Sequence, residues 1–264
     1  MKIGFIGLGN MATAIIGGVV KNGVATANDI CGSDVSQERR DLIMAKGILT
    51  VTDSNTYVAE NADVLVLAVK PQFLAGAVAE LKGKIKPSTI VISIVAGRKL
   101  EDLEELLGED VKIVRTMPNT PALICEAATA YTPNKNVTKE DEEIAVKVIS
   151  SFGKAIPVSE NLMDAVVGVS GSAPAYVFMF IEAMADGAVA EGMPRKMAYD
   201  FAAQAVMGSA KLMLETGKHP GELKDMVCSP AGTTIAAVRS LEGAGFRGAV
   251  MDAVIEAAEV SKEL

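Results

Sequence analysis

The sequence predicts an α/β fold with a doubly wound, mostly parallel sheet in its first part and an all-α fold in its second part. Up to about residue 160, short β-branched runs alternate with helical stretches, which is the pattern of successive βαβ units. After that point the strand pattern stops, and helices rich in Ala and Met follow, separated by Gly and Pro. We therefore expect two domains, residues 1–160 and 161–264.

The expected strands are short and mostly apolar. Val64–Val69 is apolar throughout, as is typical of a parallel strand that is covered on both faces. In chain order we place strands near Lys2–Ile6, Asp29–Ser33, Leu49–Thr52, Val64–Val69, Ile90–Val95 and Lys112–Thr116, and two further short ones near Ala127–Tyr131 and Ala155–Val158.

Two expected helices of the second domain, about Ala175–Glu191 and Arg195–Glu215, carry few charges. The stretch from Phe201 to Ala210 has none. A helix that is apolar nearly all round must be buried. Because a helical domain of about a hundred residues has too little interior for two such helices, we expect another subunit to cover part of them. The sequence thus predicts a homodimer.

Composition excludes several classes of partner. The formal net charge of −8 leaves no basic surplus for a nucleic acid or an anionic membrane surface. The longest uncharged run, Ala165–Ile181, contains two glycines and Pro174, so we expect it to be too short and too interrupted to cross a bilayer. The three cysteines show no paired spacing, and no secretory signal precedes the first strand. We expect a soluble, cytoplasmic protein with reduced thiols.

The strongest motif is Gly7-Leu8-Gly9-Asn10-Met11-Ala12, which directly follows the first strand and begins a helix. Gly7 allows a tight turn, Gly9 lets a pyrophosphate approach the backbone, and Ala12 replaces the third glycine of the usual pattern. This context predicts a Rossmann dinucleotide-binding domain, although a plain strand-to-helix turn is the alternative. The candidate cofactor residues at this turn are Ile6, Gly7, Leu8, Gly9, Asn10 and Met11.

The end of the second strand bears on the choice of dinucleotide. NAD binding usually uses a carboxylate there for the ribose 2′-hydroxyl, and Asp34 is near the right place. Its neighbours, however, are groups that suit a 2′-phosphate, namely Ser33, Ser36, Arg39 and Arg40. We therefore favour NADPH, with NADH accepted; the alternative is that the two arginines lie on a solvated helix face.

Three later turns follow strand ends, where ligands bind in doubly wound sheets. They are Ala68-Val69-Lys70-Pro71, Ala96-Gly97 and Met117-Pro118-Asn119-Thr120-Pro121. We expect the nicotinamide half of the cofactor to lie near them, with Asn119 as a candidate contact. A structural turn without ligand contact is the alternative for the proline-flanked loop.

The helical half contains a small-residue loop that leads into a helix, Ser229-Pro230-Ala231-Gly232-Thr233-Thr234-Ile235. Unpaired N–H groups and hydroxyls that converge at a helix start can bind a carboxylate. An ordinary capped helix start is the equal alternative.

The sequence contains no pattern typical of metal or nucleophilic catalysis, so we expect no metal site. His219 is the single histidine and stands before Pro220 in what reads as a turn or helix start. Glu182 and Asp186, four residues apart, are read as an acidic stripe on a surface rather than as metal ligands.

Three segments of the second half resemble those of the pyrroline-5-carboxylate reductase family: Gly168–Tyr176, His219–Asp225 and Ser229–Ile235. The glycine motif, Ala68–Pro71 and Met117–Ala122 also fall where that family has them, so the resemblance covers essentially the whole chain. It implies a Rossmann domain, a helical dimerisation domain, assemblies of dimers, and the NAD(P)H-dependent reduction of Δ1-pyrroline-5-carboxylate to L-proline, the last step of proline synthesis.

The resemblance also implies residue roles. Ser33, Asn55, Lys70 and the Ala96-Gly97 turn belong to the cofactor side, with Asn55 near Lys70. Thr234 directs its hydroxyl at the ring nitrogen, and the carboxylate is bound by Ser229, Ala231, Gly232, Thr233 and Thr234. Ala231 departs from the glycine of many members, which leaves the backbone donors intact unless the loop requires a positive φ there.

Two other functions are consistent with parts of the sequence. Reductases of the β-hydroxyacid dehydrogenase type share this architecture, but they resemble one another in a catalytic lysine on the first long helix of the second domain, and Pro174–Glu191 has no lysine. A non-enzymatic nucleotide sensor would not need the Ser229–Thr234 loop.

Overall fold

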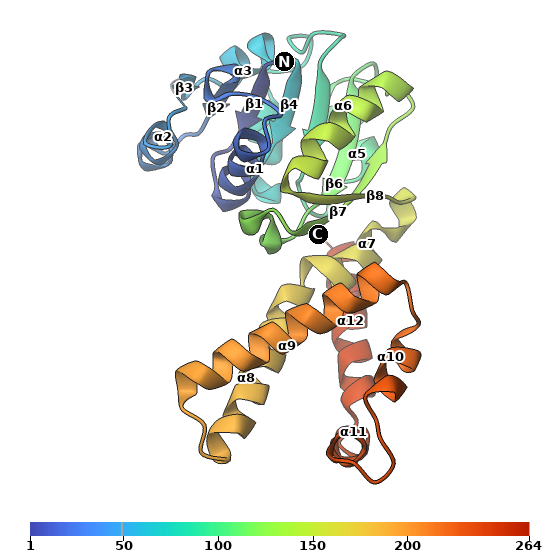
Figure 1. Cartoon of the computed structure of the whole chain (residues 1–264). Coiled ribbons are helices and arrows are strands. Elements are labelled where there is room, and N and C mark those ends of the chain that lie inside the picture. The colour runs from blue at the N-terminus through green and yellow to red at the C-terminus, as the bar shows by residue number, and fades with distance from the viewer. Residues whose placement is uncertain (49, 264) are drawn as a thin grey trace. The chain divides into compact units, whose positions relative to one another are not determined.

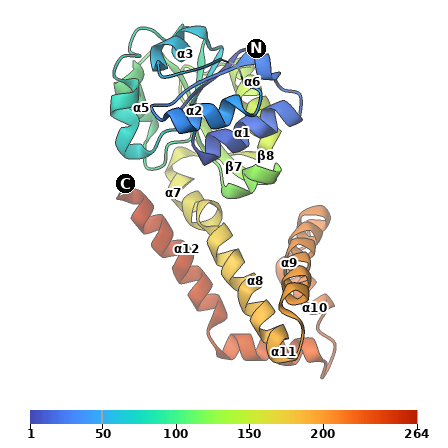
Figure 2. The same ribbon diagram turned by 90° about the vertical axis from the view of Figure 1, so that its left-hand side faces the viewer.

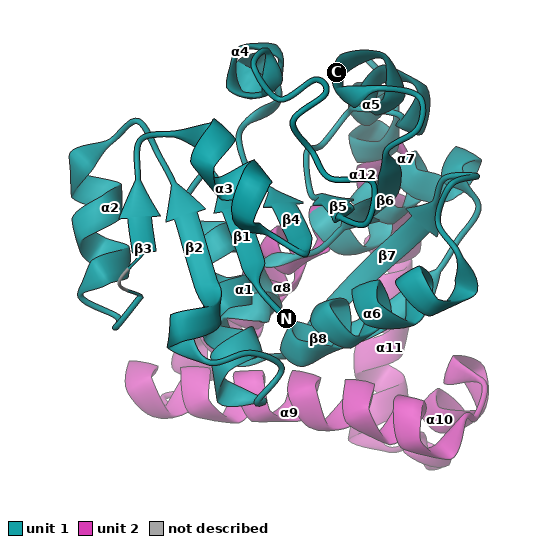
Figure 3. Ribbon diagram, turned by 90° about the horizontal axis from the view of Figure 1, so that it is seen from above, with its two compact units in different colours: residues 1–171, 256–264 teal, residues 172–255 magenta. Residues whose placement is uncertain are grey.

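The structure, a computed structural model, describes residues 1–48 and 50–263, which form two compact units (Figure 3). Unit 1 contains residues 1–171 and 256–264, and unit 2 contains residues 172–255. The division thus falls at Gly171, beyond the predicted boundary at residue 160. The segment between residue 160 and Gly171 stays with unit 1 because both of its ends are hydrogen-bonded there. Glu160 accepts a hydrogen bond from the N–H of Leu100 (2.7 Å), and Ser170 donates one to the carbonyl of Ala128 (3.3 Å).

Unit 1 is built on one eight-stranded sheet with the order β3-β2-β1-β4-β5-β6-β7-β8 (Figures 1 and 3). All neighbouring strands are parallel except β6 and β7, which are antiparallel. The strands are β1 (Ile3–Ile6), β2 (Ile30–Ser33), β3 (Thr50–Thr52), β4 (Val64–Leu67), β5 (Ile90–Ser93), β6 (Lys112–Met117), β7 (Ala127–Pro133) and β8 (Gly153–Pro157). The predicted strands match these in order; Leu49, predicted to start the third, lies outside the described residues.

Helices cover both faces of the sheet because residues alternate between the two faces along each central strand. Ile3 and Phe5 of β1 pack with α1 (Asn10–Lys21), α2 (Gln37–Met44) and α6 (Lys139–Ile149). Ile6 packs on the opposite face with α3 (Asn55–Asn61), α4 (Leu74–Val78) and α5 (Leu100–Leu107). The predicted α/β doubly wound fold is confirmed.

The remaining helical elements are the short connections of unit 1 and the helices of the second half of the chain. Unit 1 also contains the short turns η1 (Ala27–Asp29), η2 (Pro71–Phe73), η3 (Thr120–Ile124), η4 (Ser150–Phe152) and η5 (Glu160–Leu162), then α7 (Met163–Val166) and the π-helical turn η6 (Val167–Gly171). Unit 2 contains α8 (Ala173–Ala190), α9 (Arg195–Thr216), α10 (Pro220–Met226) and α11 (Thr233–Gly243), and α12 (Phe246–Lys262) starts in it. The predicted all-α second half is confirmed.

The two apolar helices α8 and α9 are the longest of unit 2 (Figures 1 and 2). Within the described chain they are mostly uncovered: Ala185 is the buried residue of α8, and Ala198 and Ala202 are those of α9. Met179 is 68% exposed and Phe201 is 63% exposed. The sequence predicts buried helices here, and a single chain does not bury them.

The helical run Glu160–Ala190 is long and apolar enough, by length and composition, to cross a membrane. The sequence predicts that glycines and Pro174 interrupt this stretch. Instead, η6 continues the helix through Gly168 and Gly171, and Pro174 occupies the first turn of α8, where a proline is tolerated because no intrahelical N–H bond is lost. Length and composition alone do not distinguish a membrane span from an apolar helix that a protein partner covers.

One buried ion pair ties α6 to the sheet. The Asp141 carboxylate lies 2.8 Å from the Nζ of Lys112 on β6 and accepts hydrogen bonds from the N–H of Thr138 (3.0 Å), which caps the helix. Burial tends to raise the pKa of Asp141, but the hydrogen bonds from Lys112 and Thr138 outweigh it, so the pKa lies below its ordinary value.

We expect Asp141→Asn to lower the free energy of unfolding by about 2 kcal/mol at pH 7, because charge-assisted hydrogen bonds are lost. A carboxyl with a depressed pKa stabilises the fold above its unfolded-state pKa of about 4 and loses that contribution as the pH falls through the folded-state pKa. The difference between wild type and variant should therefore shrink in acid. Urea unfolding at several pH values measures it, and Glu140→Gln, at an exposed position of the same helix, is the control. An equal difference at pH 7 and pH 3 would contradict this account.

Candidate functional site

Unit 1 contains a cleft of about 630 Å³ at the carboxyl ends of β1, β2 and β4. It combines segments that are far apart in the sequence, because parallel strands end at the same edge of the sheet. Its lining residues are Ile6, Gly7, Gly9, Ser33, Asp34, Val35, Ser36, Arg39, Asn55, Ala68, Val69, Lys70, Gln72, Phe73, Gly76 and Ala77.

The glycine turn leaves room for a ligand close to the backbone. Gly7 has φ of +91°, and a Cβ there would lie 2.7 Å from the carbonyl oxygen of Ala68, so the turn requires glycine. A Cβ on Gly9 would meet no heavy atom of the described residues within 4 Å. Gly9 is also the N-cap of α1, whose first N–H groups start here. The turn therefore fits the pyrophosphate of a dinucleotide.

A polar chain crosses the base of the cleft. The Ser33 hydroxyl donates to Oδ1 of Asn55 (2.7 Å), and Nδ2 of Asn55 donates to the carbonyl of Ala77 (2.8 Å). Lys70 lines the same cleft and forms no ion pair within residues 1–48 and 50–263. Asn55 and Lys70, which the family resemblance expects to be near each other, both line this cleft, and the ammonium is available for an anion.

The two arginines of α2 have different surroundings. Arg39 lines the cleft, and its Nη1 donates to Oδ1 of Asn10 (3.2 Å) on the glycine turn. Arg40 does not belong to the lining; its guanidinium donates to the carbonyl of Asp34 and to the side chain of Gln37. Only Arg39 is therefore placed to meet a ligand.

Sequence reasoning missed several lining residues. Phe73 is 60% exposed and Val35 is 92% exposed, although both are large and apolar. Val35 follows the end of β2 and Phe73 follows the turn after β4, so a large apolar residue just beyond a strand end that is predicted to bind a ligand is the signal that would have found them. Gln72, Gly76 and Ala77 complete this side of the cleft.

Some predicted cofactor residues do not line the cleft. The Leu8 side chain is fully buried in the core, Met11 packs partly against it, and Asn10 reaches the cleft region through Arg39. Pro71 starts the turn η2 next to Lys70. These residues shape the cleft without appearing on its surface.

The predicted residues that follow β5 and β6 lie elsewhere in unit 1. Ala96 and Gly97 line a small separate cavity with Arg115 and Met117. Asn119 uses its whole amide within the protein: Nδ2 donates to Ser170 (3.2 Å to Oγ), and Oδ1 accepts from the N–H of Ala128 (3.0 Å). Asn119 thus ties the end of β6 to β7 and η6.

The predicted substrate loop belongs to unit 2 and leads into α11. Gly232 is the N-cap residue of α11, and within the described residues no side chain caps this end of the helix. A Cβ on Gly232 would lie 2.3 Å from Oγ of Ser229 and 3.2 Å from its carbonyl oxygen, so a side chain here would displace the Ser229 hydroxyl. The first N–H groups of α11, from Thr233 onward, are therefore open to an anion.

Ala231 adopts φ of +55°, so the loop does require a positive φ at the position where many family members have glycine. An alanine in this region costs about 1–2 kcal/mol relative to its usual conformations. The N–H of Gly232 donates to the carbonyl of Ser229 (3.1 Å), so the N–H groups that the loop leaves open begin at Thr233.

Two side chains that the sequence analysis set aside have structural partners. Nδ1 of His219 accepts a hydrogen bond from the N–H of Gly221 (3.1 Å) and caps α10, as expected for a helix start. Asp186 forms an ion pair with Arg195 of α9. Neither residue lies in the cleft of unit 1.

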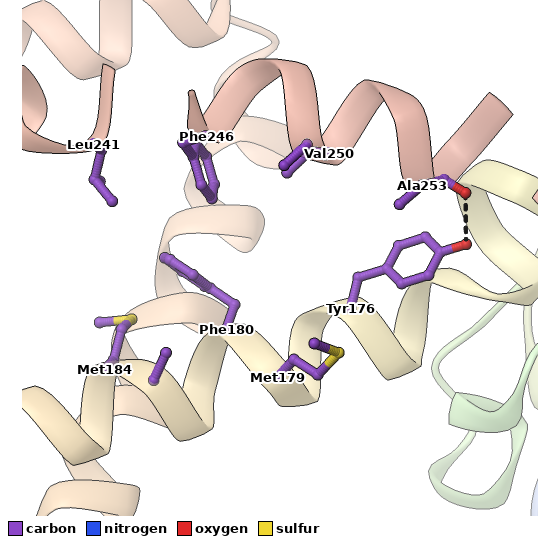
Figure 4. Close-up of a pocket in the computed structure, with 10 residues that line it drawn as sticks. Tyr176, Met179, Phe180, Met184, Leu241, Phe246, Val250 and Ala253 are labelled. Atoms are coloured by element: carbon purple, nitrogen blue, oxygen red, sulfur yellow. Dashed lines mark hydrogen bonds between the residues drawn. The ribbon is translucent and has the colours of Figure 1, made fainter. Parts of the chain in front are cut away.

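An apolar cavity of about 650 Å³ lies in unit 2 between α8, α11 and α12 (Figure 4). The rings of Phe180 and Phe246 face each other at a centroid distance of 5.9 Å, and the Tyr176 hydroxyl donates to the carbonyl of Ala253 (3.2 Å). This hydroxyl is thus already engaged, and the other lining side chains are apolar. The cavity has no groups for a charged cofactor or substrate.

A Rossmann sheet whose glycine turn leaves its backbone open, joined to an all-α unit, is an architecture typical of nicotinamide-dependent oxidoreductases. Residues 160–264 match the family model described as pyrroline-5-carboxylate reductase dimerisation, and residues 2–97 match the one described as NADP oxidoreductase, coenzyme F420-dependent. The pyrroline-5-carboxylate reductase of Methanosarcina acetivorans is 51% identical over 100% of this chain and 97% of its own length.

Solved structures agree with this relationship. The Plasmodium falciparum pyrroline carboxylate reductase with NADP bound has a TM-score of 0.90 and 33% identity, covering 100% of this chain and 97% of that one. The Coxiella burnetii pyrroline-5-carboxylate reductase has a TM-score of 0.92 and 35% identity, covering 99% and 97%. The chain belongs to the pyrroline-5-carboxylate reductase family.

The chain is accordingly an oxidoreductase that reduces the imine bond of Δ1-pyrroline-5-carboxylate to give L-proline in proline biosynthesis, with NADPH as the cofactor. The alternative of a β-hydroxyacid dehydrogenase type is set aside by the full-length identity to reductases of the imine. The all-α half is the dimerisation region, and the protein forms a homo-oligomer.

We expect Arg39→Ala to raise the KM for NADPH at least tenfold and that for NADH less than threefold, because a guanidinium that meets a 2′-phosphate contributes about 1.5–3 kcal/mol. Steady-state kinetics with both dinucleotides measure the two values. Arg40→Ala is the matched control: it removes the same charge from outside the cleft lining, and because its partner is the Asp34 carbonyl, it should leave the ratio of the two KM values unchanged. Equal increases for both dinucleotides in Arg39→Ala would show that Arg39 does not meet the 2′-phosphate.

Proposed function

We propose that the cleft of unit 1 holds NADPH, with its pyrophosphate at the Gly7–Gly9 turn and its 2′-phosphate at Arg39. The observation that carries the proposal is that one cleft gathers Gly9, Arg39 and Lys70 from three separate segments. Each offers what an anionic ligand needs: open backbone, a guanidinium and an ammonium. NADH fits the same cleft without using Arg39, so we propose that it is accepted more weakly.

The remaining cofactor contacts follow from the cleft and its neighbourhood. Ser33 and Asn55 offer polar atoms at the base of the cleft, and Ala68 and Val69 lead from β4 to Lys70. We propose that the nicotinamide half extends toward the Ala96-Gly97 turn at the end of β5, because parallel strands present their carboxyl ends to a ligand at one edge of the sheet. Asn119 then acts by holding its loop in place.

We propose that the loop Ser229–Thr234 binds the substrate carboxylate. Its donors are the Ser229 hydroxyl and the N–H groups of Thr233 and Thr234 at the start of α11, whereas the N–H of Gly232 donates to the carbonyl of Ser229 (3.1 Å). A helix N-terminus adds a favourable dipole for a negative charge. Ala231 shapes the loop through its positive φ and contributes no side-chain contact.

Thr234 completes the proposed substrate site by forming a hydrogen bond with the ring nitrogen. The reaction adds a hydride to the imine carbon and a proton to the nitrogen, and the bound nicotinamide supplies the hydride. The chain's residues orient the ring and polarise the imine. A neutral hydroxyl is a weak acid, so Thr234 positions the nitrogen while the proton comes from solvent.

The apolar faces of α8 and α9 support a homodimer through the helical half. Their exposed side chains, such as Met179 and Phe201, lie within the region matched by the dimerisation model. Contiguous apolar surface of this kind is covered in a soluble assembly. We propose that a second copy covers it, that dimers assemble further, and that the protein is cytoplasmic with neither a membrane nor a nucleic acid as partner.

We also propose that residues 1–160 and 161–264 are the functional domains, one for the cofactor and one for substrate and dimerisation. The dimerisation model begins at residue 160, which supports this division. The segment from Glu160 to Gly171 is then part of the second domain by its match to the dimerisation model, although it packs with unit 1.

We expect Thr234→Ala to lower kcat/KM for Δ1-pyrroline-5-carboxylate by one to three orders of magnitude, the loss typical of one aligned hydrogen bond at a reacting centre. NADPH oxidation, followed by absorbance, measures it. Thr234→Ser keeps the hydroxyl and should recover most of the rate, whereas Ser240→Ala deletes a hydroxyl farther along α11 and should match wild type. Wild-type kinetics in Thr234→Ala would remove Thr234 from the reaction.

We expect light scattering to give at least twice the mass of one 27.5 kDa chain in dilute solution. Met179→Glu, which places a charge in the apolar cavity of unit 2, should shift the protein toward monomer because an unpaired charge is costly in a buried interface. Leu123→Glu, at an equally exposed apolar residue of unit 1, is the control (65% exposed). A monomeric wild type would refute the proposed dimer.

A further inference from the structure

We propose that Asp34 is a positioning residue that holds the glycine turn in place, and that it does not bind the ribose 2′-hydroxyl. The inference rests on the proposed cofactor cleft, which Asp34 lines. A carboxylate near the end of the second strand is commonly the group that selects NAD. In this chain the carboxylate of Asp34 has other partners.

Both carboxylate oxygens of Asp34 accept hydrogen bonds from backbone N–H groups. Oδ2 accepts from the N–H of Leu8 at 2.8 Å, and Oδ1 accepts from the N–H of Ser36 at 2.9 Å. We call these two bonds the Asp34 bridge. It joins the glycine turn after β1 to the start of α2, across 26 residues of sequence.

The Leu8 N–H is available for this bridge because α1 does not use it. The first intrahelical bond at this end runs from the N–H of Thr13 to the carbonyl of Gly9. The Leu8 side chain is fully buried and would lie 2.7 Å from a Cβ on Gly32, so it fills the space over that glycine. The bridge and this packing together fix the residue between Gly7 and Gly9.

The backbone of Asp34 is fixed as well. Its N–H donates to the carbonyl of Thr52 (3.2 Å), and its carbonyl accepts from the guanidinium of Arg40. The preceding residue, Ser33, accepts at its carbonyl from the N–H of Gly7 (2.8 Å). The carboxylate is therefore presented to Leu8 by a rigid support.

This arrangement changes how the cleft distinguishes the two dinucleotides. A free carboxylate here would accept hydrogen bonds from a 2′-hydroxyl and repel a 2′-phosphate. Because the two backbone N–H groups fix the position of the Asp34 carboxylate and offset part of its charge, we assign the discrimination to Arg39. Asp34 then supports both dinucleotides equally, by keeping the turn at the pyrophosphate in shape.

The first test is the KM of Asp34→Ala for NADPH and NADH. We expect both KM values to rise about tenfold, because one charge-assisted bridge is lost. The two factors should agree within threefold, and kcat should change less than either KM value. Glu38→Ala is the matched control: it removes a negative charge from the first turn of α2, outside the cleft lining, and should leave the ratio of the two KM values unchanged. A rise for NADH alone, or a fall for NADPH, would identify Asp34 as the 2′-hydroxyl ligand and overturn the proposal.

The second test needs no cofactor and separates this proposal from the proposed function. Amide hydrogen exchange at Leu8 and Ser36 in the free protein should accelerate at least tenfold in Asp34→Asn, which keeps the size of the side chain but loses the charge and one acceptor. Unchanged exchange would overturn the bridge even if NADPH binds as proposed. Faster exchange in a protein whose cleft binds no dinucleotide would leave the bridge and refute the proposed function instead.

Discussion

The cleft depends on the close approach of three strand ends at Gly7. The N–H of Gly7 donates to the carbonyl of Ser33 at the end of β2, while its missing Cβ leaves room for the carbonyl of Ala68 at the end of β4. Any larger residue would push the neighbouring strands apart at the edge where the cleft opens. One glycine therefore brings two strand ends together. The end of β2 carries Ser33 and is followed by Arg39, and the end of β4 leads to Lys70.

The residue types of this chain, both those present and those absent, are consistent with imine reduction. A single histidine, which caps α10, and three separate cysteines offer no general base or metal ligand set. Imine reduction does not need them, because the nicotinamide carries the hydride and the protein contributes orientation and electrostatic complementarity. Backbone N–H groups at α1 and α11 are well suited to this task, since they are fixed by the helices and need no change of protonation.

Those features that depend on local sequence could be predicted, and those that depend on distant contacts could not. Val64–Leu67 forms a strand because it is apolar on both faces, and the turn after β1 forms because Gly7 allows its positive φ. The full engagement of Asn119, however, arises from Ser170 and Ala128, which no spacing rule connects to it.

At the end of β2, the sequence likewise could not predict the contacts of individual side chains. Arg39 and Arg40 are adjacent and chemically identical, so the sequence treats them as a pair. The helical rotation of about 100° per residue places one toward Asn10 and the other toward the backbone of Asp34. Similarly, Asp34 appears in the sequence as a possible ribose ligand, and its bond to Leu8 becomes visible only when β1 and β2 are paired.

The left-handed conformation of Ala231 bears on the other half of the site. A glycine would relieve the strain of about 1–2 kcal/mol, but it would also give the loop more conformations in the absence of substrate. At Gly232, directly after it, a side chain would displace the Ser229 hydroxyl. Two successive glycines would leave the start of α11 free to move, whereas Ala231 limits the φ and ψ values of the residue before the N-cap. The strain is thus compatible with a preorganised loop, in which the N–H groups of α11 already converge before the carboxylate arrives.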